Sequence, residues 1–191
     1  MNSATVHFEC IRCGACCKNL DLIVTLTGRD IAKIAISLGL SSEQMLRAVD
    51  FYIQDENGSL PIGLKHIPQI VTEEGQAIIA LKKNPDGDCI FLKDALCMIH
   101  EIRPGACAAY PFVFERKDDG MTWGLSAMKE ICPGIGNGPA VRESELLETA
   151  TMVLEEIEIY REFANDWNTI RESHTALQIL SDVLSDIRFI V

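Results

Sequence analysis

Residues 8–17 of this 191-residue chain read Phe8-Glu9-Cys10-Ile11-Arg12-Cys13-Gly14-Ala15-Cys16-Cys17, and they hold four of its eight cysteines. The first three cysteines are each separated by two residues, and the fourth follows directly. A tight loop can bring such thiols to one point, because Gly14 is free to take a positive φ where the chain doubles back. The spacing therefore predicts a metal-binding loop.

The other four cysteines, Cys89, Cys97, Cys107 and Cys132, stand singly along the chain. Eight thiols can form two four-thiolate sites, or one larger site that leaves some cysteines structural. A disulfide framework is the competing interpretation, but such frameworks are typical of much shorter secreted domains. The chain opens Met1-Asn2-Ser3-Ala4-Thr5 without an apolar signal region. We therefore expect reduced thiols in the cytoplasm, free to bind metal.

The charge balance argues against two classes of partner. The chain carries 28 acidic residues against 17 Lys and Arg, for a formal net charge of -11. Such a field repels phosphate backbones and anionic membrane surfaces. No apolar run approaches the roughly 20 residues of a transmembrane helix. We therefore expect neither nucleic acid nor a membrane as a partner.

Local signals between the cysteines predict short elements of both kinds. Thr27 and Ser41 are expected to cap two small helices, the first of which should end at Gly39. Strand-like composition occurs at 22–26, 77–81 and 89–92, and a hairpin is expected from 109–116 and 121–128 around the turn at 117–120. The predicted fold class is α+β: a small, mostly antiparallel sheet with short helices around the cysteine metal site.

The composition changes after Gly138-Pro139. Apolar residues recur at helical spacing from Leu146 to Trp167, and a second stripe holds Leu177, Leu180, Val183, Leu184 and Ile187. These patterns predict a metal-binding domain at 1–138 and a helical C-terminal extension, a helical hairpin, at 139–191. The long stripe exceeds what one small sheet needs, so it could bind a protein partner or a second copy of the chain. Internal packing on the metal domain is the alternative.

The ordered cysteine motifs resemble the CxxCxxCC cysteine-cluster family. The matching segments are Cys10-x2-Cys13-Gly14-x-Cys16-Cys17, Cys89-Ile90-Phe91-Leu92, Cys97 to Arg103-Pro104, Cys107 to Tyr110-Pro111-Phe112, and Cys132-Pro133-Gly134. The resemblance covers about residues 8–138 and implies zinc or iron chelation, often as an iron–sulfur protein, with all eight cysteines at family positions. His100 stands where the family often has an aromatic residue, so it is not assigned as a ligand.

Zinc and iron–sulfur clusters require different spacings. A zinc ribbon usually takes two C-x2-C knuckles, and only the N-terminal run contains that spacing. Cys10, Cys13, Cys16 and Cys132-Pro133 instead fit bacterial ferredoxin ligation of a 4Fe–4S cluster, which leaves Cys17 with Cys89, Cys97 and Cys107. Neighbouring residues of an extended chain project to opposite sides, so Cys16 and Cys17 could serve two adjacent sites. One cluster with structural cysteines, and zinc as the metal, remain alternatives.

Two further residues are candidates for contact with the cofactor. Arg103 could offset thiolate charge or pair with a carboxylate, and backbone N–H groups near Gly134 could reach the sulfur of Cys132. The leading function is an iron–sulfur protein in electron transfer or in support of a partner's cofactor. A zinc-stabilised interaction module is the alternative. The family also includes relatives of a flagellin lysine N-methylase, which implies a methyltransferase-like enzyme as a third possibility. No catalytic residue is assigned.

Overall fold

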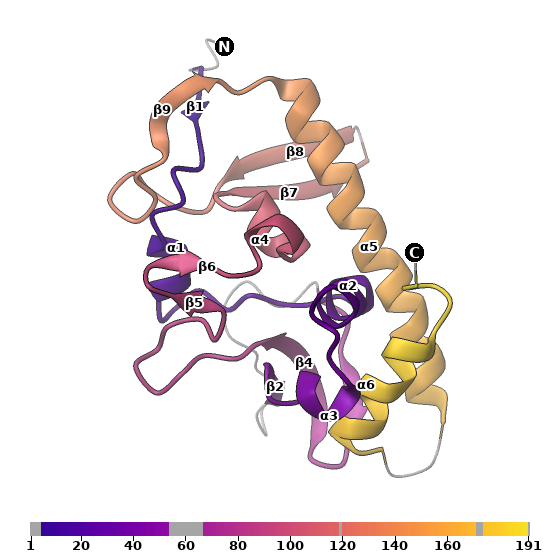
Figure 1. Ribbon diagram of the computed structural model, residues 1–191. Helices are drawn as coiled ribbons and strands as arrows, with labels where there is room; N and C mark the ends of the chain where they lie inside the picture. The colour runs from indigo at the N-terminus through magenta and orange to yellow at the C-terminus, as the bar shows by residue number, and fades with distance from the viewer. Residues whose placement is uncertain (1–4, 54–66, 119, 171–173, 191) are drawn as a thin grey trace.

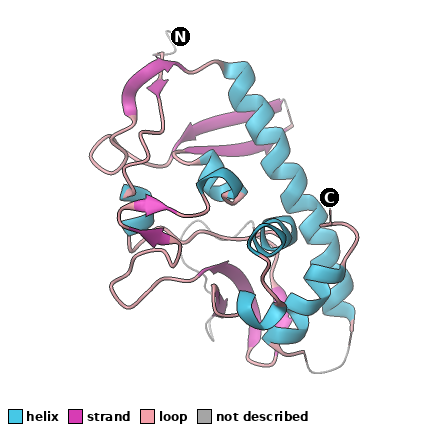
Figure 2. Ribbon diagram, viewed as in Figure 1, coloured by secondary structure: helices cyan, strands magenta, loops and turns pink. Residues whose placement is uncertain are grey.

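The computed structural model describes residues 5–53, 67–118, 120–170 and 174–190, which form an α+β fold as predicted (Figures 1 and 2). The helices are α1 (Ala15–Lys18), α2 (Gly28–Leu38), α3 (Ser42–Met45), the 3-10 helix η1 (His100–Ile102), α4 (Gly105–Ala109), α5 (Glu143–Thr169) and α6 (Ala176–Ser185). The strands are β1 (His7–Phe8), β2 (Val49–Ile53), β3 (Ile70–Thr72), β4 (Gly75–Leu81), β5 (Leu92–Lys93), β6 (Leu96–Cys97), β7 (Phe112–Lys117), β8 (Gly120–Leu125) and β9 (Ile135–Ala140).

The described strands pair only in antiparallel fashion, as expected. They form four small sheets instead of one: β1 with β9, β5 with β6, the hairpin β7–β8, and a three-stranded sheet in the order β2-β4-β3. In the largest sheet Val49 lies opposite Leu81, and Ile53 lies opposite Ala77. The segments that carry the cysteines therefore form only short strand pairs, and the largest described sheet contains no cysteine.

The two predicted helix caps are present. Thr27 and Asp30 form a capping box at the start of α2, which ends at Gly39 with φ 64°. Ser41 and Gln44 form the same box at α3. These boxes satisfy backbone N–H groups that a helix start otherwise leaves without partners. The buried face of α2 belongs to the core, where α6 packs against both α2 and α3.

Helix α5 runs along one side of the molecule, while α1, β5 and β6 lie on the opposite side (Figure 1). The ring of Phe163 on α5 lies 6.1 Å from that of Tyr160, 6.1 Å from that of Trp167 and 5.3 Å from that of Phe189. All four residues belong to the cluster that also contains the buried residues of α2. The two segments divided at residue 138 thus share one core, and their division into domains stays a prediction.

Three local predictions differ from the structure. Segment 22–26 forms a single bridge, Thr25 with Ala80, because the chain turns at once into the cap of α2. Cys89 likewise forms one bridge, with Lys83, and strand β5 begins only at Leu92. Ile187 lies beyond the end of α6 and is 86% exposed, since the backbone becomes extended at Asp186.

Among the described helices, none is both long enough and apolar enough to cross a membrane.

Candidate metal centre

Cysteines from five separate parts of the chain line two neighbouring cavities. Cys10 and Cys13 precede α1, which carries Cys16 and Cys17; the others lie before β5 (Cys89), on β6 (Cys97), on α4 (Cys107) and before β9 (Cys132). All eight are free thiols. The fold thus brings thiols separated by up to 122 residues, Cys10 and Cys132, to the lining of one cavity.

The N-terminal loop turns at Gly14, whose φ of 71° confirms the predicted left-handed conformation. Its carbonyl oxygen accepts hydrogen bonds from the backbone N–H groups of Cys17 (3.0 Å) and Lys18 (3.2 Å). Cys16 and Cys17 therefore lie on a single helical turn, and the prediction of an extended chain here is wrong. Successive side chains of a helix diverge by about 100°, yet the thiols of Cys16 and Cys17 still reach each other in a hydrogen bond.

Two neighbouring cavities are lined by the cysteines. The smaller, about 50 Å³, is lined by Cys89 together with Cys16, Cys17, Cys97 and Cys107. The larger, about 200 Å³, is lined by Cys10, Cys13 and Cys132, and it shares Cys16, Cys17, Cys97 and Cys107 with the smaller one. As they stand, no three His, Cys, Asp or Glu side chains in the described ranges are arranged to hold a metal ion. The thiols lie near one another, and metal binding would require their side chains to turn toward a common point in each site.

Electrostatic effects link the thiols in two sets that share Cys16. The pKa of Cys17 is raised by its hydrogen bond with Cys16, by burial, and by the charges of Cys16, Cys89 and Cys97. Burial first, and then the charges of Cys16, Cys89 and Cys97, raises the pKa of Cys107. The pKa of Cys132 is raised by burial and by the charges of Cys13 and Cys16. Cys16 thus stands between the sets.

Cys16 itself has the opposite shift. Its hydrogen bond with the Cys17 side chain lowers the pKa of the Cys16 thiol to about 6, and the positive charge of Arg103 contributes in the same direction. A lowered pKa favours the thiolate, the form of cysteine that binds metal.

The glycine-rich segment after Cys132 contacts the N-terminal cysteine loop, and residues of both segments line the larger cavity. Backbone hydrogen bonds from Gly134 and Ile135 lower the pKa of Cys132 in opposition to burial. The Gly134 carbonyl accepts a hydrogen bond from the backbone N–H of Glu9 (3.3 Å), and Phe8 lies opposite Ile135 where β1 pairs with β9. Gly134 therefore holds Cys132 close to the N-terminal cysteine loop.

We expect Gly134→Ala to weaken metal retention at this end of the site. A methyl group at Gly134 would lie 2.4 Å from the backbone oxygen of Glu9, so β1 and β9 must separate. Metal per chain after gel filtration measures the effect. The control is Gly124→Ala, whose methyl group would meet Val113 at an ordinary 3.7 Å. Equal metal retention in both variants would show that the close approach at Gly134 does not position Cys132.

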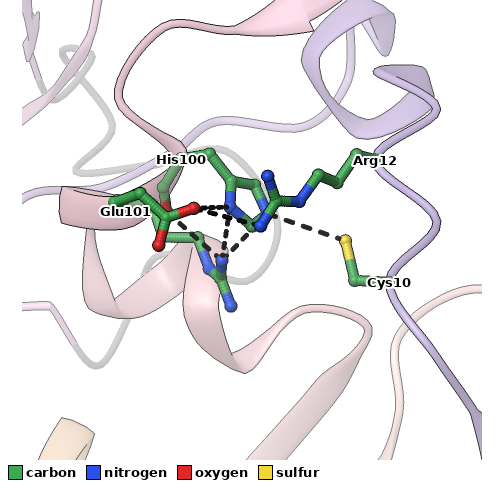
Figure 3. A network of polar contacts seen from close by, with 5 residues as sticks. Cys10, Arg12, His100 and Glu101 are labelled. Atoms are coloured by element: carbon green, nitrogen blue, oxygen red, sulfur yellow. Dashed lines mark hydrogen bonds and ion pairs between the residues drawn. The ribbon is translucent and has the colours of Figure 1, made fainter.

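Arg103 lines the smaller cavity and lies against the ring of His100, with Nη1 3.1 Å from Nδ1 and 2.9 Å from Nε2. The Nε2 atom of His100 is 4.0 Å from the Cys10 sulfur. Glu101 completes this network, accepting a hydrogen bond from Arg12 at 3.0 Å (Figure 3). No carboxylate in the described ranges lies within ion-pair distance of Arg103, so the network, and not a carboxylate pair, orients it.

His100 is the site residue that the sequence did not identify. Its spacing, three residues after Cys97 and three before Arg103, is the only signal, and 90 residues separate it from Cys10. Tyr110 lines both cavities, and its hydroxyl is buried without a hydrogen-bond partner in the described part of the chain. Burial and the nearby charges of Cys132, Cys16 and Cys13 raise the pKa of Tyr110 to about 12, so the hydroxyl keeps a proton to donate into the cavities.

One family model, described as "CxxCxxCC: Putative zinc- or iron-chelating domain", matches residues 9–133. The matched range contains all eight cysteines and ends before α5. Neither a curated protein nor a solved structure matches the chain.

Proposed function

The chain belongs to the CxxCxxCC family of putative zinc- or iron-chelating domains, and from this premise we propose that its cysteines form two adjacent thiolate sites that hold iron–sulfur clusters. The N-terminal site consists of Cys10, Cys13, Cys16 and Cys132. The central site consists of Cys17, Cys89, Cys97 and Cys107.

The two neighbouring cavities carry this proposal, because Cys89 lines only the smaller one, whereas Cys10, Cys13 and Cys132 line only the larger one. The charges of Cys13 and Cys16 raise the pKa of Cys132, and the charges of Cys16, Cys89 and Cys97 raise the pKa values of Cys17 and Cys107. Charges act strongly on a pKa only over a short distance, so these shifts mark Cys16 as a neighbour of thiols in both proposed sites. Cys16 and Cys17, adjacent on α1, would place the two sites next to each other.

The residues around the cavities suit a bound group of this kind. Thiolates are soft ligands that select zinc and iron–sulfur clusters. The unpartnered hydroxyl of Tyr110 can donate a hydrogen bond into either cavity, and Arg103 places a positive charge beside Cys16. Such surrounding donors and charges stabilise thiolate ligands. A bound cluster would supply one-electron transfer, and the protein would hold it and set its surroundings.

We infer a role in electron transfer or in support of a partner's cofactor. Analysis of iron, zinc and acid-labile sulfide after anaerobic purification tests it. Iron and sulfide in similar amounts, with a brown colour that dithionite bleaches, would support the iron–sulfur assignment. Colourless protein with stoichiometric zinc would overturn it in favour of a zinc-stabilised interaction module. Thermal stabilisation by S-adenosylmethionine would point to a methyltransferase-like enzyme.

The division of ligands is tested by single substitutions. Cys132→Ala should remove about half of the bound metal and leave the central site loaded, because Cys132 belongs to the N-terminal site alone. Cys97→Ala should remove the other half. Metal per chain and the visible spectrum report the loss, and the double variant should lose nearly all metal. Complete loss from each single variant would instead indicate one shared cluster.

A further inference from the structure

The short helix that carries Cys107 has no cap of its own. Helix α4 spans Gly105–Ala109, and Pro104, the residue before it, offers no side chain that can accept a hydrogen bond from the first turn. An isolated helix of five residues is unstable in water, because the first turn costs more entropy than one hydrogen bond returns. The position of α4 must therefore come from contacts with other elements.

Helix α5 packs against α4, and Asp30 of α2 provides a second, directional contact. Its Oδ1 atom accepts a hydrogen bond from the backbone N–H of Gly105 at 2.9 Å, across 75 residues of sequence. The other oxygen, Oδ2, accepts hydrogen bonds from the backbone N–H and the hydroxyl of Thr27, both at 3.0 Å. One carboxylate thus joins the start of α2 to the start of α4, and it is 2% exposed.

Lys33, one turn along α2 from Asp30, contacts the chain just before α4. Its ammonium group donates a hydrogen bond to the Arg103 carbonyl oxygen at 3.0 Å and lies 3.9 Å from the Asp30 carboxylate. The two α2 side chains therefore hold the backbone at Arg103 and at Gly105. Residues 103–107 therefore carry both anchored positions and also the Cys107 thiol, and Arg103 lines the smaller cavity together with Cys107.

We propose that Asp30, assisted by Lys33, is a positioning residue that holds the Cys107 thiol and Arg103 in place for the central site. The inference rests on the proposed function. A buried, charge-assisted hydrogen bond is strong and directional, and its loss leaves the Gly105 N–H without a partner inside the protein. Helix α4 would then be free to shift, and Cys107 would move with it.

The test compares three variants with the full-length protein. Asp30→Ala removes both functions of the carboxylate. Asp30→Asn keeps an amide oxygen that can accept the Gly105 N–H. Thr27→Ala weakens the cap of α2 but leaves the contact between Asp30 and Gly105, so it controls for fraying of the helix.

Two readouts are needed, one with metal and one without. Zn²⁺ is the probe metal, and its affinity at each site is measured by competition with a chelator. Alkylation of Cys107 and Cys132 is followed by peptide mass spectrometry in metal-free folded protein. We expect Asp30→Ala to weaken Zn²⁺ binding at the central site by about 10- to 100-fold, the range found when residues that orient metal ligands are removed. Cys107 should be alkylated several-fold faster, and Cys132 at the wild-type rate.

The conservative and control variants complete the expected pattern. Asp30→Asn should restore part of both properties, because its single oxygen can accept the Gly105 N–H while its NH2 group no longer accepts from Thr27. Thr27→Ala removes one hydrogen bond to Oδ2 but keeps Oδ1, so it should lie closer to the wild type than Asp30→Ala. If Asp30→Ala does not fold, Lys33→Met cuts the second anchor and should also speed alkylation of Cys107. Wild-type alkylation of Cys107 in the folded variant used would overturn the positioning role. Failure of the wild-type protein to bind Zn²⁺ would instead overturn the proposed function, while the alkylation readout still tests Asp30.

Discussion

The double substitution of Phe163 by Glu and Trp167 by Gln is expected to unfold the chain. The two side chains are 4% and 3% exposed, and they stack on each other in the shared core. The Trp167 indole N–H also donates a hydrogen bond to the Val71 carbonyl oxygen at 3.0 Å. The change removes two large aromatic groups and leaves a carboxylate and an amide in an apolar core. We expect a loss of more than about 4 kcal/mol in the free energy of unfolding.

Urea denaturation, size-exclusion chromatography and metal content measured on one preparation check this expectation. Met152→Glu on the same helix is the control, because Met152 is 46% exposed and a surface change costs within about 0.5 kcal/mol. The double substitution also tests the prediction that α5 binds a partner or a second copy. A smaller, soluble, fully metallated species would favour that interface over the core.

Removal of metal is expected to loosen the cysteine segments while the rest of the fold persists. These segments contain little regular structure: α1 is four residues long without a buried residue, and β5 and β6 have two residues each. In zinc-finger peptides the bound metal contributes an apparent 10 to 16 kcal/mol of folding free energy, on the order of a whole domain's stability. Strong chelation, or Cys13→Ser, should thus cost residues 8–20 and 89–107 most of their protection, except at the start of α4, where Asp30 and Lys33 hold Gly105 and Arg103 without metal.

Hydrogen exchange read by mass spectrometry measures this loss peptide by peptide. Helices α2 and α6 serve as the internal control, since they pack against each other and neither lines the two cysteine cavities. Native protection at 8–20 and 89–107 after verified metal removal would mean that packing alone stabilises these segments. Loss of protection throughout would mean that the metal stabilises the whole chain.

Much of the local structure follows from neighbours in sequence. Thr27 with Asp30 and Ser41 with Gln44 start their helices because each pair satisfies N–H groups within one turn. The turn at Gly14 was also predicted from a local property, because glycine takes a positive φ without the steric strain that a side chain causes. The prediction of a strand at 22–26 was wrong because strand composition does not show how soon the chain must turn into a helix.

The α+β class, the family and the eight thiols could be predicted from the sequence, because spacing and periodicity are properties of nearby residues. Which distant residues surround those thiols could be learned only from the folded chain. His100 lies beside Cys10 across 90 residues, and Asp30 holds Gly105 across 75. Neither contact leaves a periodic trace in the sequence, because both arise when the core of α2, α5 and α6 packs and carries the attached loops into place.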